Sequence, residues 1–541
     1  MRPFFYPLTI SSILCIILGC TATEEDIARN SPDENFTLVV LISVDQLRDD
    51  LLDRYNPLFT GGLRQLLDHG HRFLNSTHDH ASTTTAPGHA TLAAGVHPKR
   101  HGIVGNSWSE FQNGKWHNVY SVEDAQTSIV GFPTMPGRSP ANIYRDGLPD
   151  WISKANPKAR VVSISRKDRS AIGLAGKTVG EVYWMAPTLG QFITSTFYHS
   201  EYPEWVNRFN EEVMPKIYGD TIWNSLVPEK YESLTRPDTS VYERRGAPSL
   251  FPYLASKEAD LNDGSALNLW RYSTPFPDEA VLGFAQAAIN ELALGQLSAV
   301  DYLGISFSQT DQIGHIYGPL SREQLDNLLR LDDILGRLFQ MLDETVGPKA
   351  WVAGFSADHG TLEIPELLAK SGIDAGRLGS EESDAFRQTV EEALSSSTKS
   401  DSLSWKMKSS LEALPFIEKA YTSTQLEIVQ WLENIKIQPD SFATLFANSF
   451  SRDRAVGRAA QNGVYLRNLP NFLWTSYPST HGSPYYYDRN VPIIFLGSRI
   501  EAGVSEERVA TVDVAPTLAR LAGIKIPEDL DGRALLVTPS H

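Results

Sequence analysis

The chain has 541 residues, 41% of them hydrophobic and 21% charged, which is long enough for one large catalytic domain or up to about three ordinary ones. This composition excludes a disordered, collagenous or coiled-coil chain. The 48 Lys and Arg residues against 65 Asp and Glu residues give a net charge of −17, which argues against nucleic acid as a partner.

The first 35 residues have the features of an export signal followed by a polar tether. Residues 3–23 carry no charge, Arg2 precedes them, and an apolar run ends at Ile17-Leu18-Gly19-Cys20. This pattern predicts a lipoprotein-type signal peptide over residues 1–19, with Cys20 acylated, and a tether over residues 20–35. The alternative is an uncleaved anchor, because about 20 apolar residues can span a bilayer. Either way we expect an exported protein of the periplasm or cell envelope, in contact with a membrane only through this anchor.

Both cysteines, Cys15 and Cys20, lie in this leader. The body of the protein therefore contains no disulfide, no cysteine zinc site and no cysteine nucleophile. Any site in the body must use other side chains.

Short apolar runs rich in β-branched residues recur along the body and predict buried strands. They lie at residues 36–44, 159–165, 300–306, 350–356 and 491–496. Strands buried on both faces are mostly parallel, and helical patterns such as 322–342 and 512–522 alternate with them. The alternation predicts an α/β fold with a mostly parallel central sheet and helices on both faces, forming one catalytic domain over residues 36–541. Segments at about 190–275 and 365–470 fit poorly and are expected to be insertions that cap one edge of the sheet.

Side chains that can bind a metal gather where these runs end. They are three aspartates and three histidines: Asp45, Asp311, His315, Asp358, His359 and His481. Asp311 and His315 are four residues apart, so on a helix they would share one face. Ligands bind at the carboxyl ends of strands in open α/β sheets, so the six residues are expected to converge. Carboxylates and imidazoles suit zinc, whereas each residue alone would more often be a helix cap or a structural histidine.

A hydroxyl-rich segment, Ser82-Thr83-Thr84-Thr85, lies between the first and second of these ligands. A helix is expected to follow, starting near Ala90. A hydroxyl just before a helix gains from the positive end of the helix dipole and from an adjacent metal, which makes Thr85 a candidate nucleophile. The alternative interpretation is a threonine that only caps the helix.

Two cations, Lys167 and Arg169, follow the second apolar run. Aimed at a site, they would favour the dianion of a phosphate monoester over the monoanion of a diester. The alternative is a solvated cluster of surface charges.

The motifs together resemble the alkaline phosphatase superfamily, and more narrowly the bacterial phosphate-irrepressible alkaline phosphatases with a threonine nucleophile. The resemblance runs through nearly all of the mature chain. The matching segments are Ser43-Val44-Asp45, Thr85-Ala86-Pro87-Gly88-His89, His101-Gly102-Ile103-Val104-Gly105-Asn106, Lys167-Asp168-Arg169, Asp311 to His315, Asp358-His359-Gly360, Thr480-His481-Gly482 and Val512-Asp513-Val514-Ala515-Pro516-Thr517.

The resemblance implies two zinc ions per chain. One would be held by Asp311, His315 and His481. The other would be held by Asp45, Asp358 and His359, with Thr85 as nucleophile and further ligand. Asn106, Lys167 and Arg169 would bind the phosphoryl oxygens. No structural magnesium site is expected.

The implied function is a zinc-dependent alkaline phosphatase that hydrolyses small-molecule phosphate monoesters through a phospho-threonine intermediate. The first alternative is a nucleotide pyrophosphatase or phosphodiesterase of the same superfamily. The second is an inactive surface lipoprotein that binds metal or glycan, using the aromatic residues between Tyr198 and Tyr253. Sulfatases are excluded, because the body has no cysteine and the segment at Thr85 lacks their arginine. The sequence leaves the oligomeric state open, with a monomer as the expectation.

Overall fold

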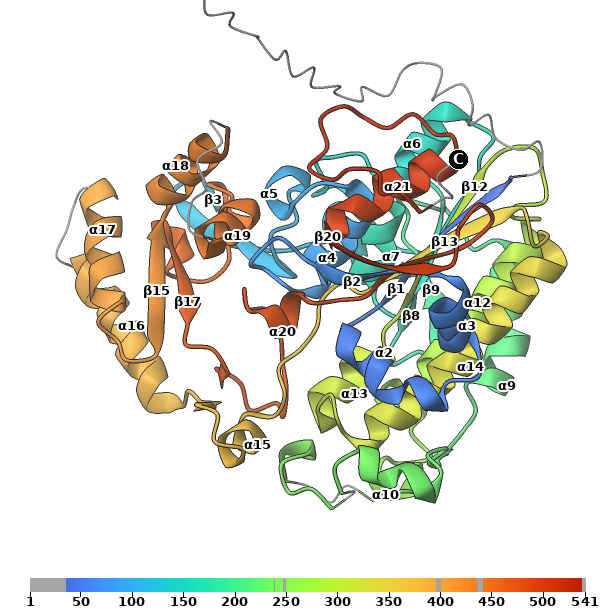
Figure 1. Ribbon diagram of the computed structural model, residues 1–541, viewed down its shortest axis with the longest axis horizontal. Helices are drawn as coiled ribbons and strands as arrows, with labels where there is room; N and C mark the ends of the chain where they lie inside the picture. The colour runs from blue at the N-terminus through green and yellow to red at the C-terminus, as the bar shows by residue number, and fades with distance from the viewer. Residues whose placement is uncertain (1–35, 238, 247–249, 396–399, 435–440, 538–541) are drawn as a thin grey trace, which may run out of the picture.

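The computed structural model describes residues 36–537 apart from 238, 247–249, 396–399 and 435–440, so the predicted signal peptide, tether and acylated Cys20 lie outside the described residues. A nine-stranded sheet forms its centre (Figure 1). In chain order its strands are β1 (Leu38–Val44), β2 (His71–Thr77), β7 (Val161–Ser165), β8 (Glu181–Ala186), β9 (Gln191–Ile193), β12 (Asp301–Phe307), β13 (Trp351–Ser356), β19 (Ile493–Gly497) and β20 (Gly503–Ala510). Their order across the sheet is β20-β2-β19-β13-β1-β12-β7-β8-β9. All five predicted strands are present.

The sheet is mostly parallel, as predicted. β1 pairs in parallel with β12 and β13, and β12, β7 and β8 continue in the same direction. The strand from the predicted run 491–496, β19, is antiparallel to both of its neighbours, as β9 is to β8. An unbroken apolar run shows that a strand is buried on both faces of the sheet. Such strands are mostly parallel, but burial does not fix the direction of any single one.

Helices cover both faces of the sheet, and β1 contributes alternate side chains to two cores. Leu38, Val40 and Ile42 pack in one core with α3 (Gly62–His69), α12 (Phe276–Glu291) and α14 (Arg322–Thr345). Val39 and Leu41 pack on the other face with residues of α4 (Thr85–Ala94), α6 (Leu148–Ala155), α7 (Asp168–Ala175) and α21 (Val514–Leu521). This explains why β1 is apolar at every position.

The two segments expected to be insertions pack differently. In the first, aromatic residues such as Trp205, Trp223 and Tyr253 are buried in the core beneath α12 and α14. They are therefore core residues and not an exposed glycan-binding face. The second forms the lobe drawn in orange in Figure 1, with small apolar clusters of its own. Its elements include α16 (Ser380–Ser395), α17 (Ser400–Leu411), β15 (Ile417–Thr422), α18 (Ser423–Asn434), α19 (Ser441–Ser449) and β17 (Val464–Asn468). The division into one domain with insertions stays a prediction.

A small three-stranded sheet joins this lobe to the central unit. β16 (Arg454–Ala455) of the lobe pairs with β3 (Ser107–Gln112), which pairs in turn with β4 (Lys115–Tyr120). A second hairpin, β5 (Glu123–Ile129) and β6 (Phe132–Arg138), follows in the chain. Two hairpins thus follow the predicted motif at 101–106, and α6 and β7 lie between them and the motif at 167–169.

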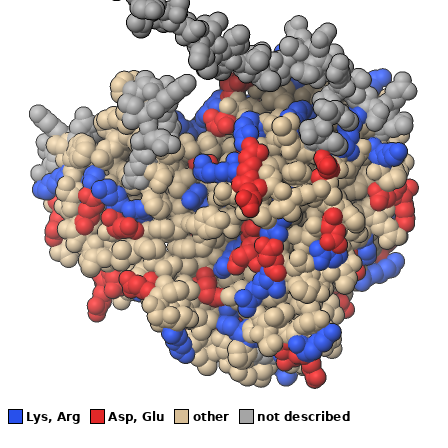
Figure 2. Space-filling model, in the orientation of Figure 1, with Lys and Arg blue, Asp and Glu red and all other residues tan. Residues whose placement is uncertain are grey.

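The surface in Figure 2 carries acidic and basic side chains interspersed over wide neutral areas. The net charge of −17 is therefore not gathered in one patch on this face. None of the helices in the described part of the chain has both the length and the apolar character needed to cross a bilayer.

Candidate metal centre

The predicted ligands converge because their strands are neighbours. Asp45 follows β1, Asp358 follows β13, and Asp311 lies in the first turn of α13 (Gln309–Tyr317), directly after β12. Lys167 follows β7, the next strand across the sheet. Since these four strands are parallel, their carboxyl ends bring the side chains to one edge, where open α/β sheets bind ligands.

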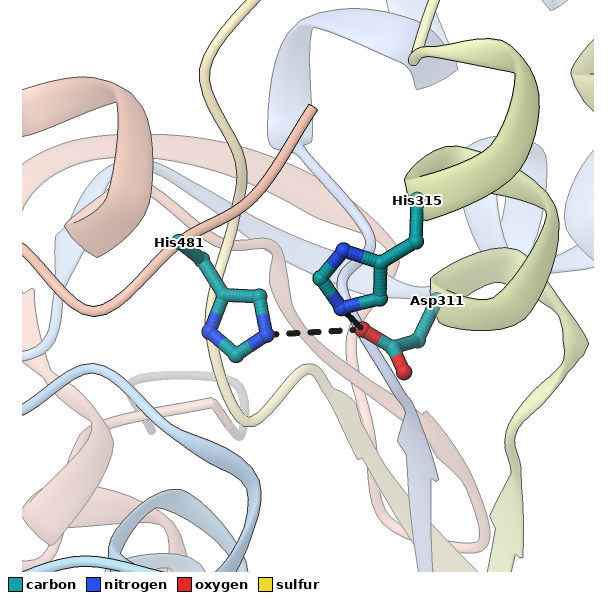
Figure 3. A group of neighbouring side chains, drawn as sticks. All are labelled: Asp311, His315 and His481. Carbon is teal, nitrogen blue, oxygen red and sulfur yellow. Dashed lines mark ion pairs between the residues drawn. The ribbon is translucent and has the colours of Figure 1, made fainter. Parts of the chain in front are cut away.

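Asp311, His315 and His481 form the first group (Figure 3). Asp311 and His315 lie on the same face of α13, as their spacing predicts, with Oδ1 of Asp311 3.1 Å from Nε2 of His315. His481 approaches from a loop on the opposite side, with its Nε2 3.5 Å from the same oxygen. A ligand atom from each residue lies within 4.8 Å of the others, so the group could hold one metal ion.

The residues predicted to hold the second ion, Asp45, Asp358 and His359, are called the second group. The ligand atoms that lie within 4.8 Å of one another here are those of Asp45, His89 and Asp358 and those of Asp45, Asp311 and His359, so His89 and Asp311 also border this group. Nε2 of His359 lies 3.5 Å from Oδ1 of Asp45 and 3.3 Å from Oδ2 of Asp358, and all three side chains are fully buried. The rings of His359 and His481 stack with their centroids 3.5 Å apart, which places the two groups side by side.

Each of the three histidines is oriented by a backbone carbonyl. Nδ1 of His315 contacts the oxygen of Ser479 at 2.9 Å, and Nδ1 of His359 that of Gly360 at 3.0 Å. Nδ1 of His481 contacts the oxygen of Thr83 at 2.8 Å. A carbonyl only accepts, so the proton sits on Nδ1 and the lone pair of Nε2 faces the carboxylates. This tautomer is the one that a metal-binding histidine needs.

Several atoms of the second group make no hydrogen bond to any described residue, although Nδ1 of His89 lies 3.2 Å from Oδ2 of Asp358. Oδ1 of Asp45, Oδ2 of Asp358 and Nε2 of His359 are buried and make no hydrogen bond. Buried polar atoms are nearly always satisfied, and these three are one imidazole nitrogen and two carboxylate oxygens that face one another. This donor set suits a divalent cation such as zinc.

The buried carboxylates perturb each other's titration. Burial and the neighbouring Asp358 raise the pKa of Asp45 to about 7. At Asp311 burial opposes ionisation, yet the charges of Lys167 and His315 hold its pKa well below the usual value. Crowding of buried carboxylates therefore favours positive charge at the centre of the site.

Lys167 lies at that centre, with 6% of its side chain exposed. Its Nζ is 2.5 Å from Oδ2 of Asp45 and 2.6 Å from Oδ2 of Asp311, so it bridges a carboxylate of each group. The interpretation of this lysine as a solvated surface charge is therefore wrong.

Thr85 is the first residue of α4, and two of the three predicted phosphate-binding residues, Asn106 and Arg169, contact this helix start. Nη2 of Arg169 lies 3.4 Å from Oγ1 of Thr85. Oδ1 of Asn106 accepts from the backbone N–H of Ala86 at 2.8 Å, which leaves its amide hydrogens for a ligand. The helix was expected to start near Ala90. It starts five residues earlier because Pro87 fits its first turn, where a backbone N–H is not needed.

Sequence reasoning missed two residues of the site. Gln46, at a positive φ of 69°, donates from Nε2 to Asp311 and from its backbone N–H to Asp358, which links the two groups. Nothing in the sequence marks it apart from its place after Asp45. His89 contacts the oxygen of Thr85 through Nδ1 at 2.9 Å and Oγ of Ser306 through Nε2 at 2.8 Å. Its spacing of four from Thr85 was the available signal.

Comparison with known proteins finds one family model and several alkaline phosphatases that resemble this chain. A family model described as "Type I phosphodiesterase / nucleotide pyrophosphatase" matches residues 39–396. Alkaline phosphatase PhoV of Synechococcus elongatus is 30% identical over 519 residues, which cover 92% of each chain. Alkaline phosphatase PafA of Elizabethkingia meningoseptica is 29% identical over 525 residues, 92% of this chain and 93% of PafA.

The crystal structure of wild-type PafA superposes on this chain with a TM-score of 0.81 and 26% identity, covering 92% of this chain and 98% of PafA. A PafA variant superposes with a TM-score of 0.82 at 27% identity, covering 93% and 99%. That variant is substituted at a threonine, at an asparagine 21 residues further on, and at a lysine and an arginine two residues apart.

Proposed function

This chain belongs to the type I phosphodiesterase/nucleotide pyrophosphatase family, within the alkaline phosphatase superfamily, and from that premise we propose that it uses Thr85 as nucleophile at a site for two zinc ions. Its likeness to alkaline phosphatases over nearly its whole length makes it a phosphomonoester hydrolase. The zinc ions, the phospho-threonine and the individual residue roles are the proposal.

One observation carries it: Lys167 and Arg169 reach the metal groups and Thr85 from the same strand end. Arg169 points at the hydroxyl that would attack, and Lys167 bridges the carboxylates that would bind the ions. The threonine-to-asparagine and lysine-to-arginine spacings substituted in the PafA variant recur here between Thr85 and Asn106 and between Lys167 and Arg169.

Bound zinc would supply Lewis-acid stabilisation of the attacking and leaving oxygens of an in-line displacement. The hydroxyl of Thr85 would give up its proton and attack phosphorus, the P–O bond to the leaving group would break, and the alcohol would depart with a proton. Water would then attack the phospho-threonine, release inorganic phosphate and return the threonine to its hydroxyl form. The amide of Asn106 would donate to one phosphoryl oxygen, and Arg169 to another. These donors are held in place before the reaction, so charge that develops on the phosphoryl oxygens meets oriented partners.

The charge of the site favours a dianion. Two divalent ions with three carboxylates leave about +1, to which Lys167 and Arg169 add about two positive charges. A monoester carries two negative charges on its non-bridging oxygens and a diester carries one. Paired cations aimed at those oxygens therefore stabilise the monoester more strongly.

The test compares kcat/KM for an aryl phosphate monoester and its methyl diester in zinc-loaded wild type and a Lys167→Ala, Arg169→Ala double variant. We expect wild type to prefer the monoester. The variant should lose at least about 100-fold in monoester turnover while its diester turnover changes far less. A wild type that prefers the diester would overturn the proposal in favour of the nucleotide pyrophosphatase or phosphodiesterase activity after which the family is named.

We further propose that the protein is exported and held at the cell envelope by a lipid on Cys20. The support is the sequence of the leader, with an apolar run that ends in Ile17-Leu18-Gly19-Cys20. A polar tether of residues 20–35 would separate this anchor from the central sheet, which begins at Leu38.

A further inference from the structure

The β3–β4 hairpin brings a second polar residue to the phosphate-binding end of the site. Asn106 directly precedes β3, and Tyr120 is the last residue of β4. Ser107 pairs with Tyr120, and the N–H of Ser121 donates to the oxygen of Asn106 at 3.0 Å. Asn106 and Tyr120 therefore occupy the same end of one hairpin, and that end faces Thr85 and Arg169.

Tyr120 is held from two directions. Its hydroxyl donates to Oδ1 of Asp168 at 2.6 Å, and Nε of Arg138 donates to Oδ2 of the same carboxylate at 2.7 Å. The guanidinium of Arg138 also lies 4.9 Å from the centre of the Tyr120 ring. Asp168 is the first residue of α7 and the neighbour of Arg169. The hairpins and α7 thus meet in one charged network.

The network determines what Arg169 contacts. An ionised carboxylate only accepts, so the Tyr120 proton points to Asp168 and the hydroxyl oxygen is left to accept from Arg169. Nη1 of Arg169 lies 3.5 Å from that oxygen, and its Nη2 lies 3.4 Å from Oγ1 of Thr85. Nε of Arg169 is buried and makes no hydrogen bond to any described residue.

Both groups keep the charge state that this contact needs. Burial and the adjacent Asp168 raise the pKa of the Tyr120 hydroxyl, so it stays neutral. Burial alone would lower the pKa of Arg169, but Tyr120 and Asp168 raise it, so the guanidinium stays charged. The contact is long for a hydrogen bond, and it acts chiefly as a dipole that orients a cation.

We propose that Tyr120 is a positioning residue that aims the guanidinium of Arg169 at the phosphoryl group, and that Asp168 and Arg138 hold Tyr120 for this task. The inference rests on the proposed role of Arg169. It extends that role by assigning part of the preference for a dianionic monoester to the two hairpins. Asp168 lies between Lys167 and Arg169 in the sequence, and in this proposal it orients the Tyr120 hydroxyl.

The first test is Tyr120→Phe, which removes only the oxygen that faces Arg169. We expect kcat/KM for an aryl phosphate monoester to fall about tenfold, and kcat/KM for the matched methyl diester to change less than about twofold. Asp168→Asn should give the same selective loss. The matched control is Tyr198→Phe, because the Tyr198 hydroxyl is buried and makes no hydrogen bond to any described residue. It should leave both activities and the melting temperature unchanged.

A double-mutant cycle separates positioning from general damage. In an Arg169→Ala background, Tyr120→Phe should change monoester turnover less than about twofold, because the group that it orients is gone. An equal loss on monoester and diester, or the same loss with and without Arg169, would overturn the inference. If wild type instead prefers the diester, the proposed function fails. If wild type prefers the monoester but the Tyr120 and Arg169 substitutions show no coupling, this inference fails and the proposed function stands.

Discussion

At the scale of single residues, the site depends on residues that each contact two buried carboxylates. Lys167 bridges one carboxylate from each metal group, and Gln46 bonds to an aspartate of each group. Lys167 makes both contacts through its side chain, whereas Gln46 bonds to Asp311 through its side chain and to Asp358 through its backbone N–H. Removing either side chain is costly, because the carboxylates that it contacts remain buried and lose hydrogen bonds. The geometry of the two groups is therefore coupled through these two residues.

Thr85 offers the most direct test at this scale. Thr85→Ala should reduce kcat for phosphate monoesters by at least about 1,000-fold, since it removes the proposed nucleophile. Thr85→Ser, which restores a hydroxyl, should recover most of that loss. Zinc content, measured by atomic absorption, serves as the control and should stay near that of wild type, because three protein ligands remain in each group. Turnover by Thr85→Ala within tenfold of wild type would rule out a phospho-threonine.

At the scale of elements, the first turn of α4 packs directly on the end of β13. A Cβ on Gly88 would lie 2.1 Å from the backbone oxygen of Asp358, which is closer than any side chain tolerates. This close approach brings the first turn of α4, which contains Thr85, against the backbone of Asp358. The requirement is steric, since the backbone of Gly88 is that of an ordinary helix.

Gly88→Ala should therefore separate α4 from Asp358. We expect a loss of about 2–4 kcal/mol in the free energy of unfolding and a large fall in monoester turnover. Gly264→Ala is the matched control, because that glycine lies at the start of a helix with no atom within 4 Å of an added Cβ. It should change stability by less than about 1 kcal/mol. Urea unfolding of both variants makes the comparison, and equal stabilities would contradict the packing argument.

At the scale of the whole molecule, the fold buries histidines that serve no metal. His101 ends α5 (Pro98–His101), with Nε2 3.0 Å from Oγ1 of Thr91 and Nδ1 accepting from the N–H of Ile103 at 3.2 Å. It is fully buried, and burial lowers its pKa to about 3. The fold therefore holds this ring neutral under conditions in which an unfolded chain would protonate it.

Acid should destabilise the protein through this group. The pKa of His101 is lower in the folded state than the unfolded value of about 6.5, so its contribution is fully present above pH 6.5. As pH falls below 6.5, only the unfolded chain takes up the proton, and stability should drop by about 1.4 kcal/mol per pH unit for this one group. Urea unfolding between pH 7.5 and 5 measures the slope. His101→Gln, which retains a donor and an acceptor, should have a smaller slope, and an unchanged slope would exclude His101 as a source.

From the sequence alone we could predict the class of the fold and the position of five central strands, and we could propose six side chains as metal ligands. Most of those proposed ligands are marked locally, by an apolar run that ends close before them or by a helical spacing such as that of Asp311 and His315, whereas His481 lies on a loop. The direction of each single strand was not determined, because burial makes an antiparallel strand such as β19 as apolar as the parallel strands β1, β12 and β13.

The way in which the site is assembled is seen only in the tertiary structure. Gln46 bonds to Asp311 across 265 residues, and Tyr120 reaches Asp168 across 48. The periodicity of apolar residues predicts which face of a helix or strand is buried. It does not predict which distant side chain will contact that face. Long-range contacts of this kind also determine the partners of Lys167 and Arg169. They also form the separate apolar clusters of the lobe around α16 and α17. These contacts therefore could not be predicted from the sequence.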